Sequence, residues 1–190
     1  MGLAKRKLGK TGLEVSCLGF GTVKIGRNQE VKYPSGFSLP SDEEVSALID
    51  QAKDLGINFI DTAPAYGSSE QRLGRLLKNR QDWIICSKVG EEFTAGKSYY
   101  DFSAKHTQRS IERSLRDIGT DYLDIVLIHS DGQDCKILES SDCAETLLRL
   151  KGEGLIKAVG MSTKTVEGGM KAVEMLDLGM VTYNPSMQDD

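Results

Sequence analysis

The chain has 190 residues, of which 39% are hydrophobic and 27% charged, so it is expected to fold as a single globular domain with one core. Its net charge of −4 arises from Lys and Arg scattered among Asp and Glu, which argues against a nucleic-acid partner or an anionic membrane surface. No apolar run approaches the roughly 20 residues that span a bilayer, and the basic N-terminus lacks the apolar segment of a secretory signal, so we expect a cytoplasmic protein with a small-molecule partner.

The N-terminal part of the chain predicts a hairpin, a strand and a long loop. Gly9 and Gly12 in a basic segment indicate a small hairpin, and the apolar run at 15–20, followed by Gly21, indicates the first strand. Residues 23–40 are rich in Gly, Pro and Ser without a sustained period, so they predict a loop above that strand.

Two helices are predicted on either side of the second strand. Ser41 with Glu44 forms a capping box that begins a helix ended by Gly56. Another helix is expected to begin near Ser69 and to bury its leucines. Three of its basic residues are expected to face solvent, namely Arg72, Arg75 and Lys78.

Three further helices are predicted in the second half of the chain. One ends at Gly119, one begins at Asp142 and runs through Leu150, and a weaker one contains Gly168. Between the third strand and the first of these helices, residues 90–102 predict a loop.

Apolar runs predict five more strands, at 58–61, 83–88, 123–129, 156–162 and 180–183. Strands that alternate with single helices imply a parallel sheet, either open or closed into a barrel. An open dinucleotide-binding sheet would place G-x-G-x-x-G after its first strand, but the third glycine is missing after Gly19 and Gly21 and no helix follows promptly. The barrel is therefore favoured.

Ionisable side chains follow three of these predicted strands, and polar groups at the carboxyl ends of barrel strands usually perform chemistry. Asp61, Lys88 and His129 end their apolar runs, and Tyr66 follows in the loop after Asp61. A tyrosine hydroxyl has an ordinary pKa of about 10, so we expect the Lys88 cation to stabilise the phenolate and Asp61 to hold Lys88. Such a group protonates an oxyanion while hydride arrives at carbon, and it requires no metal.

At this point the sequence resembles the aldo-keto reductase superfamily. The resemblance is carried in order along nearly the whole chain by Gly19–Phe20–Gly21–Thr22, Phe59–Ile60–Asp61–Thr62–Ala63, Tyr66–Gly67, Glu70 with Leu73–Gly74, Ser87–Lys88, and Asp121–Tyr122–Leu123–Asp124 through His129.

The resemblance implies a (β/α)8 TIM barrel with NADPH, or alternatively NADH, across its carboxyl-terminal mouth, and an aldehyde or ketone as substrate. Such a barrel typically needs about 250 residues, so we expect residues 1–190 to supply the first six β-α units of one domain that is incomplete at its C-terminus. The units beyond would recognise a 2′-phosphate, so the sequence leaves NADPH and NADH undecided, as it does the substrate and the oligomeric state.

The same resemblance assigns roles to individual residues. Tyr66 would be the general acid, Lys88 and Asp61 would tune it, and His129 would orient the carbonyl. The cofactor would lie near five residues, namely Gly21, Thr22, Asp61, Ser162 and Thr163, although Thr163 stands where the family often has Asn.

Two other functions remain open at this stage. A barrel lysine at a strand end could form a Schiff base, which would make Lys88 the nucleophile of an aldolase. A redox-sensing or regulatory subunit could instead hold the cofactor with little turnover.

Overall fold

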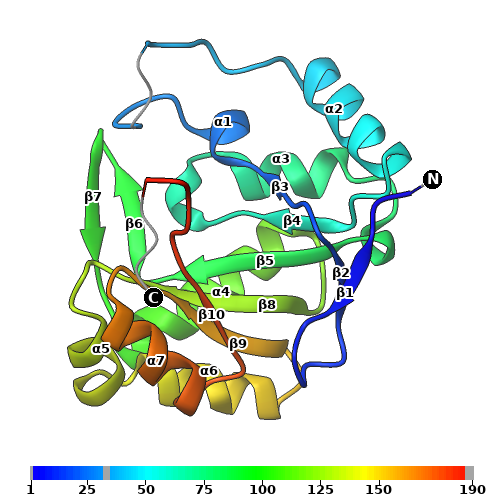
Figure 1. The fold of residues 1–190 in the computed structure, drawn as a ribbon. Helices are drawn as coiled ribbons and strands as arrows, with labels where there is room; N and C mark the ends of the chain where they lie inside the picture. Colours follow the sequence, from blue (N-terminus) through cyan, green and yellow to red (C-terminus); the bar gives the residue numbers. More distant parts are fainter. Residues whose placement is uncertain (1, 32–34, 187–190) are drawn as a thin grey trace.

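The computed structural model describes residues 2–31 and 35–186, and its centre is a six-stranded parallel sheet (Figure 1). The strands are β3 (Phe20–Gly21), β4 (Phe59–Asp61), β5 (Ile84–Val89), β8 (Leu123–His129), β9 (Ile156–Ser162) and β10 (Leu178–Met180). Their order in the sheet follows their order in the chain, and every neighbouring pair is parallel. This is the arrangement of consecutive strands in a (β/α)8 barrel.

Helices connect the strands and cover one face of the sheet. They are α2 (Asp42–Asp54), α3 (Ser69–Leu76), α4 (Ala104–Ile118), α6 (Cys143–Gly152) and α7 (Val166–Met175). In Figure 1, α4 lies behind β5 and β8, with α3 above β4 and α6 below β9. The predicted capping box of Ser41 with Glu44 is present, and α4 ends at Gly119 in the left-handed conformation, as predicted. Within residues 2–31 and 35–186, no helix has the length and apolar character needed to cross a bilayer.

Side chains alternate between the two faces of each strand, and this alternation sorts the core into two layers. On β8, Val126 and Ile128 belong to the large cluster between sheet and helices. Ile125 and Leu127 point the other way, into the barrel interior, where Leu8 of the N-terminal segment packs against them. Both faces of the sheet are buried, which is why its strands read as continuous apolar runs.

The predicted N-terminal hairpin is confirmed, and it lies at the amino ends of the barrel strands. Strands β1 (Lys5–Lys7) and β2 (Glu14–Ser16) pair antiparallel. Asn58, which directly precedes β4, accepts a hydrogen bond from the backbone N–H of Ser16 at 2.7 Å. The hairpin therefore closes the end of the barrel opposite to the carboxyl ends of the strands (Figure 1).

The strand predicted at 15–20 is wrong in its bounds. Its first residues belong to hairpin strand β2, and only Phe20 and Gly21 join the barrel sheet as β3. The chain turns between the two, and Leu18 in that turn is exposed. The last strand also differs from the prediction, since β10 covers Leu178–Met180 rather than 180–183.

Two predicted loops contain regular structure. One helical turn, α1 (Val23–Gly26), lies within the predicted loop 23–40, and it is too short to show a period in the sequence. Residues 90–102 form an antiparallel hairpin of β6 (Glu91–Thr94) and β7 (Lys97–Tyr100). Its turn places Ala95 at a φ of 51° and Gly96 at 76°, and alanine in that conformation hides the usual Asn-Gly signal.

Three short helical elements were not predicted. They are the helix α5 (Asp134–Ser140) and the 3-10 helices η1 (Pro64–Tyr66) and η2 (Arg80–Asp82). Each spans no more than two turns, so none carries a recognisable period in the sequence.

The prediction that Arg72 faces solvent is wrong. Its side chain is buried on α3 and donates hydrogen bonds to Asp42 Oδ1 at 2.8 Å and to the carbonyl oxygens of Ile25 and Pro40 at 2.7 and 2.8 Å. Ile25 of α1, Pro40 before α2 and Asp42, the first residue of α2, supply these acceptors, which helical periodicity alone does not reveal. Arg75 and Lys78 are exposed, as predicted.

Gly26 provides a test of how closely α1 approaches the loop after β4. A Cβ at Gly26 would lie 2.1 Å from the carbonyl oxygen of Tyr66 and 2.4 Å from the backbone nitrogen of Ser69. We expect Gly26→Ala to lower the free energy of unfolding by about 2 kcal/mol or more, because a backbone must move to admit the methyl group. Urea denaturation measures this change.

Gly152→Ala is the matched control, because Gly152 also ends a helix but has no atom within 4 Å of the added Cβ. It should change the stability by no more than about 1 kcal/mol, towards a more stable protein. Equal effects of the two substitutions would contradict the close approach of α1.

Candidate active site

The alternation of the strands places the predicted site residues on one face. Asp61 ends β4, Lys88 lies one residue before the end of β5 and His129 ends β8. His129 shares the parity of Ile125 and Leu127, which face the barrel interior. In register with His129, Ser162 ends β9. The carboxyl ends of four neighbouring strands thus present polar groups to the same side.

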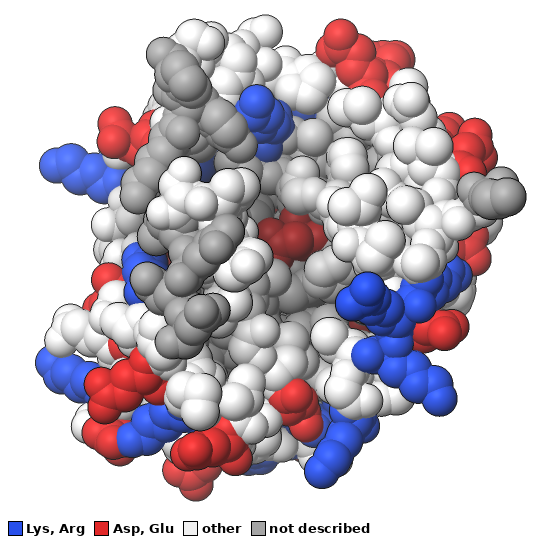
Figure 2. All heavy atoms as spheres, viewed as in Figure 1, with Lys and Arg blue, Asp and Glu red and all other residues white. Residues whose placement is uncertain are grey.

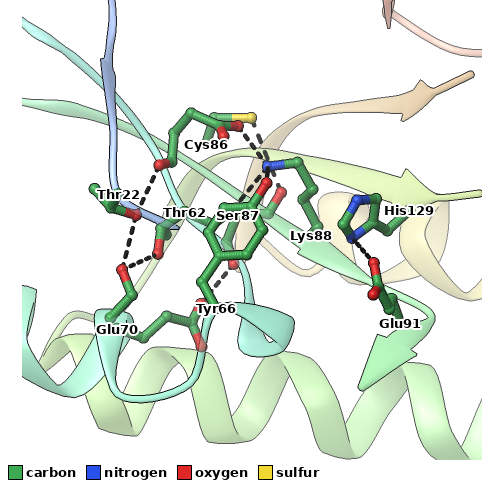
Figure 3. A network of polar contacts seen from close by, with 11 residues as sticks. Thr22, Thr62, Tyr66, Glu70, Cys86, Ser87, Lys88, Glu91 and His129 are labelled. Carbon is green, nitrogen blue, oxygen red and sulfur yellow. Dashed lines mark hydrogen bonds and ion pairs between the residues drawn. The ribbon is translucent and has the colours of Figure 1, made fainter. Parts of the chain in front are cut away.

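Lys88 lies at the centre of this group (Figure 3). Its side chain is 2% exposed, and its Nζ donates to Asp61 Oδ1 at 2.5 Å, to the carbonyl oxygen of Thr62 at 3.0 Å and to Tyr66 Oη at 3.1 Å. Burial opposes the charge on Lys88, but the Asp61 carboxylate outweighs it and holds the pKa of Lys88 above its ordinary value. All three donor hydrogens of the ammonium are used, so the buried charge is fully compensated.

Tyr66 belongs to η1, in the loop between β4 and α3. Burial raises the pKa of Tyr66 above its ordinary value, although Lys88 acts in the opposite direction. Lys88 thus lowers the pKa of Tyr66, as expected from the sequence, but burial outweighs this effect and the pKa stays above its ordinary value. At neutral pH the hydroxyl keeps its proton and can donate it.

His129 lies beside Tyr66, with the two ring centroids 6.2 Å apart and the planes at 86°. Its Nδ1 is buried and lies 2.9 Å from Glu91 Oε2 of hairpin strand β6. Sequence reasoning missed Glu91 because its segment reads as a loop. Val89 and Gly90 precede Glu91, and this pair indicates only that a strand ends in a turn, not that a functional residue follows.

The structure places the five predicted cofactor residues in different surroundings. Gly21 is exposed, and a Cβ added to it would meet no atom within 4 Å, so a ligand can approach the backbone there. Ser162 is partly exposed at the end of β9, and Asp61 keeps 23% of its side chain accessible. These residues fit a ligand lying across the carboxyl ends of the strands.

Thr22 and Thr163 are buried instead. The Thr22 hydroxyl donates to the carbonyl oxygen of Asp61 at 2.8 Å and accepts from Ser69 Oγ at 2.7 Å, so it joins β3, β4 and α3. The Thr163 hydroxyl has no hydrogen-bond partner among the described residues. A Cβ at Gly169 would lie 3.4 Å from it, so this hydroxyl faces α7.

A second buried polar group lies on the opposite face of β5. Ser87, the neighbour of Lys88, points towards the helices and donates to Glu70 Oε1 at 2.5 Å, while Ser114 of α4 donates to Glu70 Oε2 at 3.0 Å. Burial raises the pKa of Glu70 to about 7 against these two hydrogen bonds, which lower it. Glu70 therefore sits near the midpoint of its titration at neutral pH.

Figure 2 shows a hollow near the centre of the face seen in Figure 1, with acidic atoms at its base. Around it, positive and negative side chains are interspersed over the visible surface.

Comparisons with known proteins agree with the fold. The model of the aldo/keto reductase family matches residues 17–189. L-galactose dehydrogenase of Arabidopsis thaliana is 36% identical over 163 residues, which cover 83% of this chain and 47% of that protein. The chain thus spans about half the length of this curated relative.

Solved structures show the same fold. A protein from Pseudomonas aeruginosa, assigned to the aldo-keto reductases, is 58% identical with a TM-score of 0.89 over 96% of this chain and 69% of that chain. The holo form of an aldo-keto reductase from Bacillus halodurans is 31% identical with a TM-score of 0.78, over 95% of this chain and 58% of that chain. These similarities confirm the fold prediction, since the sheet corresponds to part of a (β/α)8 barrel.

The buried carboxyl of Glu70 predicts a dependence of stability on pH. Its pKa is about 7 in the folded protein and near 4.5 when unfolded, so the unfolded chain loses the proton first as pH rises. The folded state should therefore lose about 3 kcal/mol of stability through this group between about pH 4.5 and pH 8.

We expect Glu70→Gln to remove this contribution, because the amide does not titrate. The measurement is the free energy of unfolding of both proteins at several pH values, and their difference should grow in favour of Glu70→Gln as pH rises. Parallel pH profiles would show that Glu70 titrates normally.

Proposed function

The chain belongs to the aldo/keto reductase family, and on this premise we propose that it reduces a small aldehyde or ketone to the alcohol with a nicotinamide cofactor. The observation that carries the proposal is the contact of Lys88 Nζ with both Asp61 and Tyr66. A buried lysine that holds a tyrosine hydroxyl is an arrangement suited to proton transfer to an oxyanion. The substrate is a small molecule, and the cytoplasmic location stays a prediction.

Tyr66 acts as the general acid. Its Oη holds a proton at neutral pH because burial disfavours the phenolate. As negative charge develops on the substrate oxygen, Tyr66 Oη donates this proton. General acid catalysis of this kind contributes about 10²–10⁴-fold to a rate.

Lys88 stabilises the phenolate that this transfer leaves behind. Its Nζ lies 3.1 Å from Tyr66 Oη, and opposite unit charges about 4 Å apart attract by about 4 kcal/mol at an effective dielectric constant of 20. The attraction between the Lys88 ammonium and the Tyr66 phenolate therefore offsets much of the cost of burying the phenolate charge. It acts only during the reaction, when the phenolate forms. Asp61 keeps Lys88 charged and directed at Tyr66.

Five residues were expected from the sequence to hold the cofactor, namely Gly21, Thr22, Asp61, Ser162 and Thr163, and of these Gly21, Asp61 and Ser162 are accessible at the strand ends. When bound, the nicotinamide supplies the hydride. Gly21 and Ser162 offer accessible groups at the strand ends, whereas the Thr22 hydroxyl supports the site through Asp61 and Ser69. We propose NADPH as the cofactor, with NADH as the alternative.

The two other functions predicted from the sequence receive less support. A Schiff-base lysine must lose its proton, but the Asp61 carboxylate at 2.5 Å keeps Lys88 charged in spite of its burial. A subunit that binds the cofactor without turnover has no need for the contacts of Lys88 with Asp61 and Tyr66, which suit proton transfer. Tight cofactor binding with negligible turnover on a broad aldehyde panel would nevertheless favour that function.

Tyr66→Phe tests the proposed general acid. We expect the rate of carbonyl-dependent NADPH oxidation to fall about 10²–10⁴-fold, because the proton donor is lost, while NADPH binding measured by fluorescence titration changes less than about twofold. Tyr99→Phe is the control, because Tyr99 lies half exposed on β7 and should tolerate the change. A Tyr66→Phe variant that kept most of the rate would exclude Tyr66 as the acid.

A further inference from the structure

Glu91 is a partly buried carboxylate that the proposed reaction does not yet use. It begins strand β6, which is separated from the end of β5 by Gly90 alone, so the hairpin places it at the carboxyl ends of the barrel strands. Its side chain is 12% exposed. A carboxylate removed from water in this way requires partners.

The two oxygens of Glu91 have different partners, and Figure 3 shows the contact with His129. Oε1 accepts a hydrogen bond from Ser98 Oγ at 2.6 Å and lies 3.8 Å from Arg27 Nη1. Oε2 lies 2.9 Å from Nδ1 of His129. Burial opposes ionisation, but the contacts with His129, Ser98 and Arg27 outweigh it and lower the pKa of Glu91 to about 2. Glu91 is therefore ionised throughout the neutral range.

An ionised carboxylate carries no proton, so a proton shared between Glu91 Oε2 and His129 Nδ1 must belong to Nδ1. Nδ1 is buried, so water does not compete for it, and it has no hydrogen-bond partner of good geometry among the described residues; the carboxylate oxygen Oε2 of Glu91, 2.9 Å away, is its ion-pair contact. In a neutral imidazole only one nitrogen carries hydrogen, and the partner of one nitrogen fixes the state of the other. Nε2 is then the ring nitrogen that remains to contact a ligand.

We propose that Glu91 is a positioning residue that holds a proton on Nδ1 of His129 and thereby sets what Nε2 presents to the substrate oxygen. A ring with a single proton on Nδ1 presents a lone pair at Nε2 and accepts from a hydroxyl. To donate to a carbonyl oxygen, Nε2 needs a second proton, and the Glu91 carboxylate balances the charge of that doubly protonated ring. The role of Nε2 rests on the proposed function, whereas the proton on Nδ1 does not.

Arg27 fixes Glu91 in turn. Its guanidinium lies 3.5 Å from the centre of the Phe93 ring and donates to the carbonyl oxygen of Ala65 in η1 at 3.2 Å. Phe93 belongs to the same strand as Glu91, and Ala65 precedes Tyr66. The hairpin is therefore held against the loop that carries Tyr66, and Glu91 cannot swing away from His129 without breaking these contacts.

The chain contains an internal comparison, because it has two histidines and each faces one of two adjacent glutamates. Glu92 lies on the other side of β6, where its Oε1 is 3.3 Å from Nε2 of His106. The contact of His129 is through Nδ1, whereas that of His106 is through Nε2. His106 also has a second carboxylate, Asp101, whose Oδ2 lies 3.9 Å from Nδ1, whereas the carboxylate that faces His129 is Glu91.

The test is ¹⁵N NMR of the histidine rings at about pH 8, where an ordinary histidine is neutral. His106→Gln assigns the two sets of signals. In the unchanged protein we expect His129 to carry a proton on Nδ1, either alone or with a second proton on Nε2. A neutral His129 ring with its proton on Nε2 would overturn the proposal without any variant of Glu91, and without reference to activity.

Glu91→Gln and Glu92→Gln form the matched pair of variants. Glu91→Gln should move the proton of His129 to Nε2 in a large part of the molecules and lower kcat for carbonyl reduction about tenfold or more, with cofactor affinity unchanged. Glu92→Gln should alter the His106 signals and leave both His129 and kcat unchanged. An unaltered His129 signal in Glu91→Gln would show that Glu91 only anchors the hairpin.

If no carbonyl substrate were turned over by the unchanged protein, the proposed function would fail while the NMR result would still decide the role of Glu91. If instead the protein were active and kcat fell in Glu91→Gln without a change in the His129 signals, the positioning role would be wrong.

Discussion

The site depends on the compensation of one buried charge, the ammonium of Lys88. Three acceptors surround it, and they come from the end of β4, the residue after β4 and η1. Removing any of them would leave a donor without a partner in a region closed to water, which is costly. The site is therefore assembled when β4, η1 and β5 pack together, because the same contacts of Lys88 join all three elements.

The alternation of side chains along β5 separates two polar groups with opposite tasks. Lys88 faces the barrel interior, where its charge is held by Asp61, whereas Ser87 faces the helices and binds Glu70. Glu70 has two neutral hydroxyl donors and no cation in hydrogen-bond contact, so burial dominates its titration. One strand thus contacts a charged lysine on one face and, on the other, a carboxyl whose pKa lies near neutral pH.

Loop segments complete what the strand ends begin. Gly26 of α1 lets the backbone of Tyr66 approach, and the β6–β7 hairpin brings Glu91 to His129. Arg27 lies between these two segments and contacts both Glu91 and the carbonyl oxygen of Ala65. The strands fix the positions of Asp61, Lys88 and His129, and the loops fix the orientation of the tyrosine and the protonation of the histidine.

The sequence by itself determined the β-α order, the helix cap at Ser41 and the polar strand ends Asp61, Lys88 and His129, because these features depend on local periodicity and on residue type. It did not determine the burial of Arg72, the hairpin that carries Glu91 or the net rise of the Tyr66 pKa above its ordinary value. Each of these depends on which distant groups surround a side chain. Desolvation and the choice of hydrogen-bond partner arise only when segments far apart in the chain are packed together, so the tertiary structure alone decided them.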